Sequence, residues 1–377
     1  MVYMMKISKI VLTVCLSVIF SGASDLWGSE DLLPEYGSTA DSSDPITLPG
    51  TKIEVNGYLN AGGTFNTRGT YGNVASFGSR NEFGLNGAYI ALGRGTETNG
   101  CGIDWGFGAD FMFGADYRAM RTISGWDQDW KTSDDYYYGF SMPQLYAELA
   151  YNFWSVQIGR FYGCHGYEAV RADERFFYSV GLAYDSLPAT NTGVMVNYNG
   201  FDNADIAFGW VAGDDTGFGT DYGQSAFIGS ICYHFGDWSS LSWSIQAGRG
   251  GLFGVDTDEF INTLVYTARF SPHWGYAFEY DYGSNYRENV AEYHFNALSN
   301  YLFYTLNDCW RFGGRMEWLW ESGSQQTWEL TLGANWTPTS WLTVRPEIRY
   351  DNANFARFDD NQTPDQLTVG FDLMATF

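Results

Sequence analysis

The last twelve residues of the chain constrain its fold more than any other stretch. In Gln366–Phe377 apolar and polar side chains alternate with a period of two, the period of an extended strand. One face carries Leu367, Val369, Phe371, Leu373, Ala375 and Phe377, and the other includes Thr368, Gly370, Asp372 and Thr376. Such a strand, ending the chain on an aromatic residue, is typical of a membrane barrel with its apolar face in lipid. An amphipathic strand of a soluble sandwich is the alternative.

The same alternation recurs along the chain. It is clearest in Gly102–Asp116, where glycine and aspartate, including Asp104 and Asp110, share the inner face. These residues leave room and polarity there, which favours a water-filled interior over a packed core. Aromatic residues make up 19% of the chain, and the 45 Gly far outnumber the 9 Pro, as many strands and tight turns require. We therefore predict an all-β fold, a transmembrane antiparallel up-and-down β-barrel of 16 strands, with 18 as the alternative.

Long and short connections alternate between the predicted strands. The approximate strand bounds are 52–65, 82–93, 102–116, 143–151, 154–161, 192–199, 204–212, 223–235, 239–247, 260–270, 273–282, 290–306, 309–320, 326–336, 341–350 and 366–377. Outer-membrane barrels have long loops outside and short turns on the periplasmic side. Phe176–Tyr184 also looks strand-like, but counting it would give an odd number, whereas bacterial single-chain barrels have even numbers.

Two segments precede the predicted barrel, which spans 51–377. Met1–Ala23 is predicted to be a signal peptide, because two lysines lead an apolar run, Ile10–Phe20, followed by small residues. That run is shorter than the roughly 20 residues of a membrane-spanning helix. Residues 24–50 are acidic and lack periodicity, so we predict a flexible periplasmic tail. The predicted localisation is the bacterial outer membrane.

The chain is strongly acidic, with a formal net charge of −24. This charge argues against nucleic acid or an anionic membrane surface as the binding target. Cys101, Cys164, Cys232 and Cys309 follow the predicted signal, and in an exported protein they have three alternative pairings.

One connection is long enough to fold back into the barrel. A sixteen-stranded barrel is wider than its side chains can fill, so it leaves an aqueous channel unless a segment enters it. Tyr162–Asn191 is the candidate, and we predict a constriction loop there, with a plain surface loop as the alternative. The predicted constriction residues are His165, Tyr167, Glu168, Arg171, Asp173, Glu174 and Arg175.

Charged residues of the last strands fall on the inner face by alternation. An arginine on the lipid face near the bilayer midplane would cost about 2 to 4 kcal/mol. The predicted pore-lining residues are Arg311, Arg315, Glu329, Arg345, Glu347 and Arg349, together with Asp104 and Asp110. Facing acids on the loop, such arginines would create a transverse field that orders water and dipolar solutes. A ladder of salt bridges that ties neighbouring strands together is the alternative.

Four short motifs carry a family resemblance. They are Gly159-Arg160-Phe161, Gly166-Tyr167-Glu168, Phe177-Tyr178-Ser179 and Thr192-Gly193. In these motifs the chain resembles the putative beta-barrel porin-2, OmpL-like group of outer-membrane proteins. The resemblance is strongest from the fifth to the sixth predicted strand, although Asn191 stands where we expect a histidine in relatives. It implies an outer-membrane porin and carries over no catalytic residues.

The predicted function is therefore a porin, a water-filled channel for passive diffusion of small hydrophilic solutes and ions. A structural or adhesive barrel is the alternative, based on the aromatic segment Tyr117–Ser141. An enzyme is not predicted, because no nucleophile motif surrounds a serine. The predicted partners are outer-membrane lipid, small solutes and the barrel-assembly machinery, which would recognise Phe377. The sequence leaves association of three copies open.

No cofactor is predicted. The acidic segments Asp214–Asp221 and Asp256–Glu259 offer carboxylates to calcium, but their spacing matches no defined calcium loop. Solvated acidic loops are the prediction there, and loop-bound calcium is the alternative.

Overall fold

The computed structural model describes residues 45–68, 83–98, 100–123, 126–127, 129–132, 137–218, 223–250, 257–286 and 292–377. The predicted signal peptide, 1–23, lies outside these ranges, as do Asp221, Asp256 and the predicted tail up to residue 44. The tail differs from the prediction at its end, because Ile46–Thr47 form a short strand, β1, opposite Val55 and Glu54.

The described residues form a closed antiparallel barrel of sixteen strands. Their bounds are β2 (Glu54–Asn66), β3 (Gly84–Arg94), β4 (Ile103–Gly114), β6 (Leu145–Tyr151), β7 (Trp154–Tyr162), β8 (Thr190–Tyr198), β9 (Ala204–Asp214), β10 (Ser225–His234), β11 (Ser239–Gly250), β12 (Thr257–Arg269), β13 (Trp274–Tyr286), β14 (Tyr293–Asn307), β15 (Trp310–Glu321), β16 (Gln325–Thr339), β17 (Leu342–Ala353) and β18 (Asp365–Thr376). A short strand, β5 (Gly139–Ser141), pairs with β4. The predicted count of sixteen is confirmed.

The barrel closes where its last strand meets its first. β18 pairs with β2 from Thr368 opposite Asn66 to Thr376 opposite Tyr58. Beyond the last pair, the backbone N–H groups of Gly57 and Phe377 donate to each other's carbonyl oxygens, at 2.9 and 3.0 Å. Closure leaves no sheet edge, which satisfies the backbone polar groups that lipid cannot.

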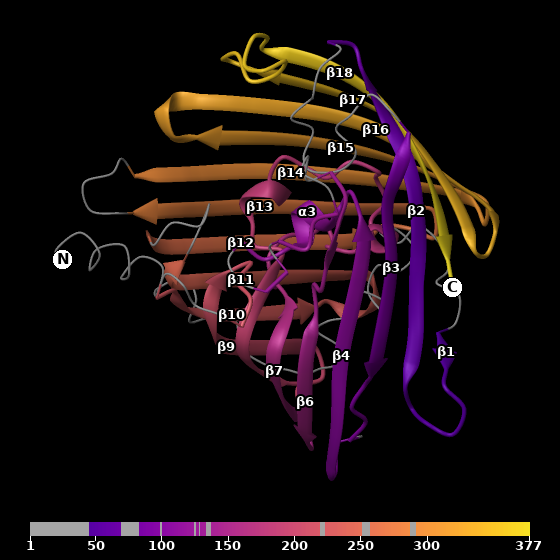
Figure 1. Ribbon diagram of the computed structural model, residues 1–377, viewed down its shortest axis with the longest axis vertical. Coiled ribbons are helices and arrows are strands. Elements are labelled where there is room, and N and C mark those ends of the chain that lie inside the picture. The colour runs from indigo at the N-terminus through magenta and orange to yellow at the C-terminus, as the bar shows by residue number, and fades with distance from the viewer. Residues whose placement is uncertain are drawn as a thin grey trace.

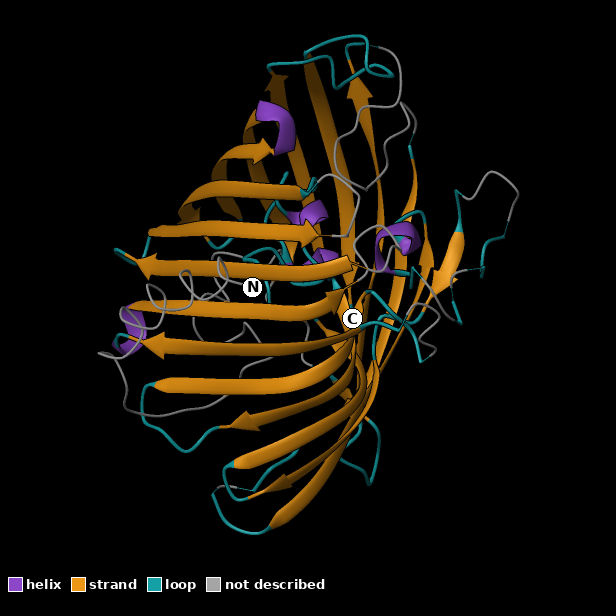
Figure 2. Ribbon diagram, turned by 90° about the vertical axis from the view of Figure 1, so that its left-hand side faces the viewer, coloured by secondary structure: helices purple, strands orange, loops and turns teal. Residues whose placement is uncertain are grey.

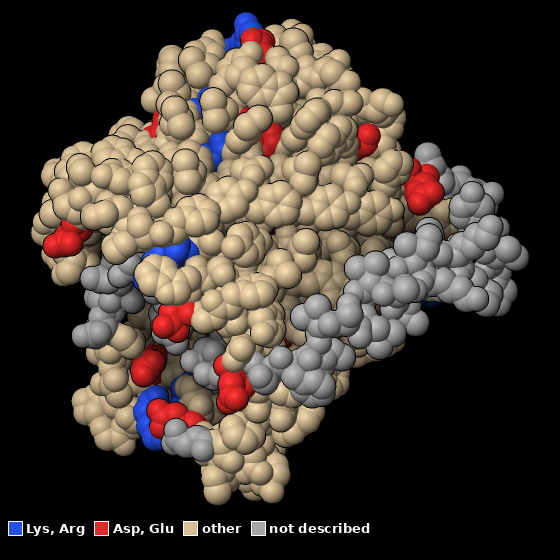
Figure 3. Space-filling view, turned by 180° about the vertical axis from the view of Figure 1, so that it is seen from behind, with Lys and Arg blue, Asp and Glu red and all other residues tan. Residues whose placement is uncertain are grey.

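Side chains sort between the two faces of the wall as the alternation predicts. On β18, Phe371 is 46% exposed on the outside, whereas its neighbour Asp372 is fully buried on the inside. Uncharged residues cover most of the outer face seen in Figure 3, and charged residues gather at its margins and around a hollow. The outer surface therefore suits contact with hydrocarbon.

Helical segments are few and short in the described part of the chain. They are α3 (Tyr117–Met120), η1 (Ala172–Glu174), η2 (Tyr184–Ser186), η3 (Gly236–Trp238) and η5 (Ser322–Ser324). None of the described helices is both long and apolar enough to cross a membrane.

The strands curve around central segments rather than around an empty space (Figures 1 and 2). One of these segments contains α3, whose Met120 packs against Tyr58 and Tyr89 of the wall. Tyr117 is also fully buried. The start of the aromatic segment Tyr117–Ser141 is therefore turned inward, which weakens its interpretation as an adhesive surface.

All four cysteines of the barrel are free thiols. Cys101 and Cys309 are exposed, and Cys164 and Cys232 are partly buried. None of the three pairings left open by the sequence forms.

Candidate functional site

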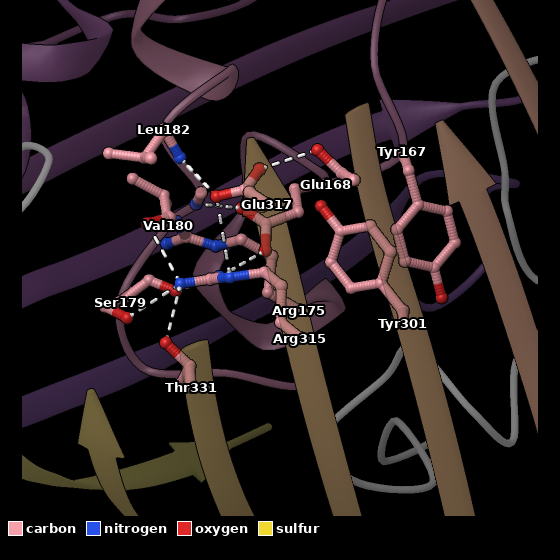
Figure 4. A network of polar contacts seen from close by, with 12 residues as sticks. Tyr167, Glu168, Arg175, Ser179, Val180, Leu182, Tyr301, Arg315, Glu317 and Thr331 are labelled. Atoms are coloured by element: carbon pink, nitrogen blue, oxygen red, sulfur yellow. Dashed lines mark hydrogen bonds and ion pairs between the residues drawn. The ribbon is translucent and has the colours of Figure 1, made fainter. Parts of the chain in front are cut away.

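The segment between β7 and β8 lies inside the barrel and contacts the inner wall. It contains η1 and η2 but no strand, so Phe176–Tyr184 adds no strand to the barrel. We call residues 163–189 the inner loop. Figure 4 shows part of it against β15 and β16.

Arg315 of β15 holds the middle of the inner loop. Its Nη1 donates to the Glu168 carboxylate at 2.6 Å and to the Ser179 carbonyl at 2.9 Å, and its Nη2 donates to the Val180 carbonyl at 3.2 Å. Its Nε donates to Glu329 of β16 at 2.7 Å. The side chain is fully buried, so these partners replace the water that a guanidinium otherwise requires (Figure 4).

Neighbouring charged residues of the wall bind the same stretch of the loop. Arg349 donates from Nη1 to the Val180 carbonyl at 2.6 Å. Glu347 accepts from the Ser179 backbone N–H at 3.1 Å, and Glu317 accepts from the Leu182 backbone N–H at 2.5 Å. Arginines thus meet loop carbonyls and carboxylates meet loop N–H groups, which fixes both the position and the direction of the chain here.

Arg345 holds the preceding turn of the loop. Its Nη1 donates to the carbonyl oxygens of Ala172 and Arg175, both at 2.8 Å, and its Nε donates to Asp372 of β18 at 2.8 Å. These bonds close the short helix η1 against the wall.

Glycines on the inner wall make room for three consecutive aromatic residues of the loop. A Cβ atom on Gly313 of β15 would lie 2.4 Å from the Phe176 ring, and one on Gly333 of β16 would lie 3.1 Å from the Phe177 ring. A third, on Gly370 of β18, would lie 3.0 Å from the ring of Tyr178. We call these three glycines the glycine bed. Larger residues there would push the loop away from the wall.

The first part of the inner loop packs on β13 and β14. The Tyr167 ring lies 4.6 Å from the Tyr301 ring, centroid to centroid, and the Tyr167 backbone N–H donates to Glu279 at 3.0 Å. Phe176 and Phe303 are 5.0 Å apart in the same cluster. Aromatic packing therefore adds to the polar contacts of the loop.

A buried ion pair lies at the base of the loop. Arg160 of β7 donates to Asp127 at 2.9 Å, to the Met142 and Met120 carbonyls at 2.7 Å each, and to the Thr190 hydroxyl. Both ends of the inner loop are thereby connected to the segment that contains α3. The sequence prediction did not include Arg160 among the site residues, although it lies in one of the four motifs.

The wall formed by β10 and β11 contacts the loop through fewer polar groups. His165 Nδ1 lies 2.9 Å from the Ser244 hydroxyl. Burial lowers the pKa of His165 to about 3, so its imidazole stays neutral at ordinary pH. Burial also raises the pKa of the Cys164 thiol to about 12, which keeps it protonated and unreactive.

A few loop residues keep contact with solvent. Asp185 is exposed, and the Glu174 side chain is 40% exposed. Burial among the surrounding protein atoms raises the pKa of Asp185 to about 6, and Arg349 and Arg357 oppose this rise. Arg171 is held at 2.6 Å from Asp173 and lies 5.0 Å above the Tyr89 ring, so only part of its charge is presented to water.

The predicted wall residues fall into two groups. Arg315, Glu329, Arg345, Glu347 and Arg349 face inward and lie buried between the strands and the inner loop, where they hold the loop instead of lining open water. The ladder considered as an alternative exists as well, because Glu329 contacts Arg315 at 2.7 Å and Arg349 at 3.3 Å.

The remaining predicted wall residues lie elsewhere. Asp110 accepts from Gln144 at 2.8 Å and from Tyr89 at 2.5 Å, and Asp104 pairs with Arg94 at 2.8 Å. Arg311 is partly buried on β15 and takes part in interactions of its own. Within the described residues, the hydrogen bonds and ion pairs of Asp104 and Asp110 go to partners outside the inner loop.

The predicted loop residues also have distinct places. Tyr167 and Glu168 bind the wall, His165 binds β11, and Arg175 is buried with its guanidinium 5.8 Å from the Tyr184 ring. Arg171, Asp173 and Glu174 of the predicted set are partly exposed, and ion pairs hold their side chains together. Asp185, which the prediction omitted, joins this solvent-exposed set.

Residues 52–377 match the family model of the putative beta-barrel porin-2, OmpL-like proteins. The chain belongs to this family. It is accordingly a porin of the bacterial outer membrane, a channel for passive diffusion. No curated protein matches the sequence.

Several solved structures share the fold of this porin. The anion-selective porin from Comamonas acidovorans is 13% identical with a TM-score of 0.61, over 86% of this chain and 99% of that chain. OprB of Pseudomonas putida is 13% identical with a TM-score of 0.58, over 86% and 93%. The trimer form of Vibrio cholerae OmpT is 12% identical with a TM-score of 0.57, over 86% and 99%.

Proposed function

We propose that the inner loop narrows the channel of this porin, and that its exposed acids favour cations over anions. The observation that carries the proposal is the attachment of the loop. Arg315, Arg345 and Arg349 hold its backbone to the wall, so solutes meet the opposite surface of the loop, where Asp185 is exposed and Glu174 is partly exposed.

The electrostatic effect follows from the arrangement of charges. The arginines are neutralised by buried carboxylates and covered by the loop, so their field toward solvent is weakened. Asp185 keeps an exposed carboxylate in a narrow, low-dielectric space, where field lines are focused. Small hydrophilic cations would therefore be enriched there, and anions of the same size would be depleted.

The direct test is ion selectivity in planar bilayers under a salt gradient. Asp185→Asn and Glu174→Gln should each lower the cation-to-anion permeability ratio by about two-fold. Asp237→Asn, in the exposed helix η3 at a short turn, makes the same charge change elsewhere and should leave the ratio unchanged. An unaltered ratio in Asp185→Asn and Glu174→Gln would remove these acids from the solute path.

The pH dependence gives a second readout of the same proposal. With its pKa raised from 3.8 to about 6, Asp185 is ionised above pH 6 and neutral well below it. Cation preference should therefore fall as the pH drops from 7 to 5, and Asp185→Asn should abolish that change. Because folding disfavours the ionised form, the Asp185 contribution to stability is greatest below pH 3.8 and is lost as the pH rises through 6.

We also propose a channel without catalytic activity, removal of 1–23 as a signal peptide and a periplasmic tail that follows it. Phe377 is partly exposed at the closing strand, which supports recognition of the C-terminus by the barrel-assembly machinery. The OmpT trimer form supports association of three copies of this porin. Chemical cross-linking in native membranes should give a product of three chains, and a product limited to one chain would rule out the trimer.

A further inference from the structure

Two carboxylates of β13 lie on the inner wall without a cationic partner. Glu279 and Asp281 are two positions apart and share the inward face of the strand. Neither forms an ion pair with Lys or Arg in the described part of the chain, whereas Glu329 lies 2.7 Å from Arg315. Glu279 is 3% exposed and Asp281 is fully buried.

The hydrogen-bonding groups beside these carboxylates are equally unsatisfied. Neither carboxylate oxygen of Asp281 makes a hydrogen bond of ordinary geometry with the described residues, although the Thr263 hydroxyl and the Glu279 carboxylate lie near it. Thr263 of β12 stands directly opposite Asp281 in the sheet, and its buried hydroxyl also makes no hydrogen bond of ordinary geometry. Glu279 accepts from the Tyr167 N–H at 3.0 Å and from the Tyr301 hydroxyl at 3.5 Å, which does not neutralise it.

Such an arrangement is costly unless another group compensates it. A buried carboxylate without a cationic partner is destabilising, and two adjacent carboxylates repel each other. The described residues hold no group of three or more His, Cys, Asp or Glu arranged for a metal. A site here must therefore combine two carboxylates with neutral oxygens, which is a ligand set for a hard divalent cation.

We propose that Asp281, Glu279 and the Thr263 hydroxyl bind one divalent cation of the calcium type behind the inner loop. Its two charges match the two carboxylates. The cation is coordinated by the Asp281 carboxylate oxygens, and water completes its coordination shell. This site differs from the acidic loop segments considered from the sequence, and it lies on the wall.

The cation would also act on the inner loop. A Cβ atom on Gly166 would lie 3.2 Å from a carboxylate oxygen of Glu279, so the loop backbone passes directly over this carboxylate. The arginine contacts hold residues between 168 and 180, and the turn at Gly166–Tyr167 is bound by Glu279. A cation that fixes Glu279 therefore fixes the entry of the loop.

The test measures calcium binding to the purified full-length porin in detergent by equilibrium dialysis. Wild type should bind one calcium ion more tightly than the diffuse sites of its acidic surface. Asp281→Asn should lose that ion or weaken its binding at least tenfold, and Thr263→Val, which keeps the side-chain volume, should weaken it several-fold. Asp237→Asn should bind calcium as wild type does.

The proposal would be overturned if wild type, Asp281→Asn and Thr263→Val bound the same number of calcium ions with the same affinity. It would also be overturned if wild type had no tight calcium site, because a proton shared between Glu279 and Asp281 would then compensate their charge. Single-channel recording tests whether the bound cation also fixes the inner loop. A chelator should increase open-channel current noise in wild type and leave Asp281→Asn unchanged. The dialysis result stands whether or not the inner loop controls selectivity.

Discussion

Two regions of the inner wall hold the same loop by different means. On β15 to β18 the buried inward residues are largely charged, with Arg315, Glu317, Glu329, Arg345, Glu347, Arg349 and Asp372 among them. On β8 to β11 they are mostly small, apolar or uncharged polar, with Met195, Ala207, Val211, Ala226, Ile228, Ser230, Ser244 and Gln246 among them. The first region makes directional bonds to loop backbone, and the second mainly packs.

The contrast shows how a long loop is given one position. Packing alone tolerates shifts of a side chain or a residue, because many apolar arrangements have similar free energies. A buried arginine that donates to particular loop carbonyls tolerates few such shifts, because each lost hydrogen bond leaves part of its charge without a partner. The charged wall, β15 to β18, therefore determines where the loop lies. The uncharged wall, β8 to β11, supports the loop by packing against it.

The largest effect is expected from Arg315→Met. It removes the bonds to Glu168, Ser179 and Glu329, leaves the buried Glu168 carboxylate without a cation, and leaves Glu329 with Arg349 alone. We expect a loss of about 3 to 5 kcal/mol of unfolding free energy, measured by urea titration in lipid vesicles, together with frequent current steps in single-channel records.

Lys52→Met is the matched control, because it breaks the exposed ion pair with Glu97 and should cost less than about 1 kcal/mol. Equal losses in Arg315→Met and Lys52→Met would mean that the charged wall has no special role.

An intermediate effect is expected from Gly313→Ala in the glycine bed. The new Cβ would lie 2.4 Å from the Phe176 ring, so the loop must shift, at about 1 to 3 kcal/mol. Gly314→Ala, the next residue on the lipid side, meets its nearest atom, on Leu332, at 3.4 Å and should change stability by less than about 0.5 kcal/mol. The same urea titration compares them.

A second substitution sharpens this comparison. If the Phe176 ring is the cause, Phe176→Leu should cost less in the Gly313→Ala background than alone. Strict additivity of the two losses would contradict direct contact.

The smallest effect is expected on the uncharged wall, from Ser244→Ala. It removes one hydrogen bond to a neutral histidine, so we expect a loss of about 1 kcal/mol and an unchanged permeability ratio. Urea titration and bilayer recording measure the two quantities. A loss as large as that of Arg315→Met would show that both walls determine the loop position.

The fold could be predicted from the sequence because strand alternation is a local signal. In each strand the alternation of apolar and polar residues indicates which side chains face lipid. The free-energy cost of an arginine in lipid then assigns the inner and outer faces of β15 and β17. The even strand count then excluded Phe176–Tyr184, whose three leading aromatic residues pack on the glycine bed instead of pairing in the sheet.

The site could be predicted only in part. Alternation places Arg315 and Arg345 inward, but it does not reveal that the loop covers them, since that depends on contacts between residues more than a hundred positions apart. The sequence does not identify Gly313 and Gly333 as site residues, because the role of a glycine depends on which side chain packs against it. Inward glycines on consecutive strands are the signal that could have indicated them.

The contact between Gly57 and Phe377 has a consequence for biogenesis. Because this contact and the β18–β2 pairing beside it join segments more than three hundred positions apart, the ring cannot form until β18 has been synthesised. The enclosed segments must already be in place when the seam joins, since afterwards a continuous wall separates them from outside. All sixteen strands must therefore be made before the closed form exists, and an export route has to keep more than three hundred residues unfolded until then.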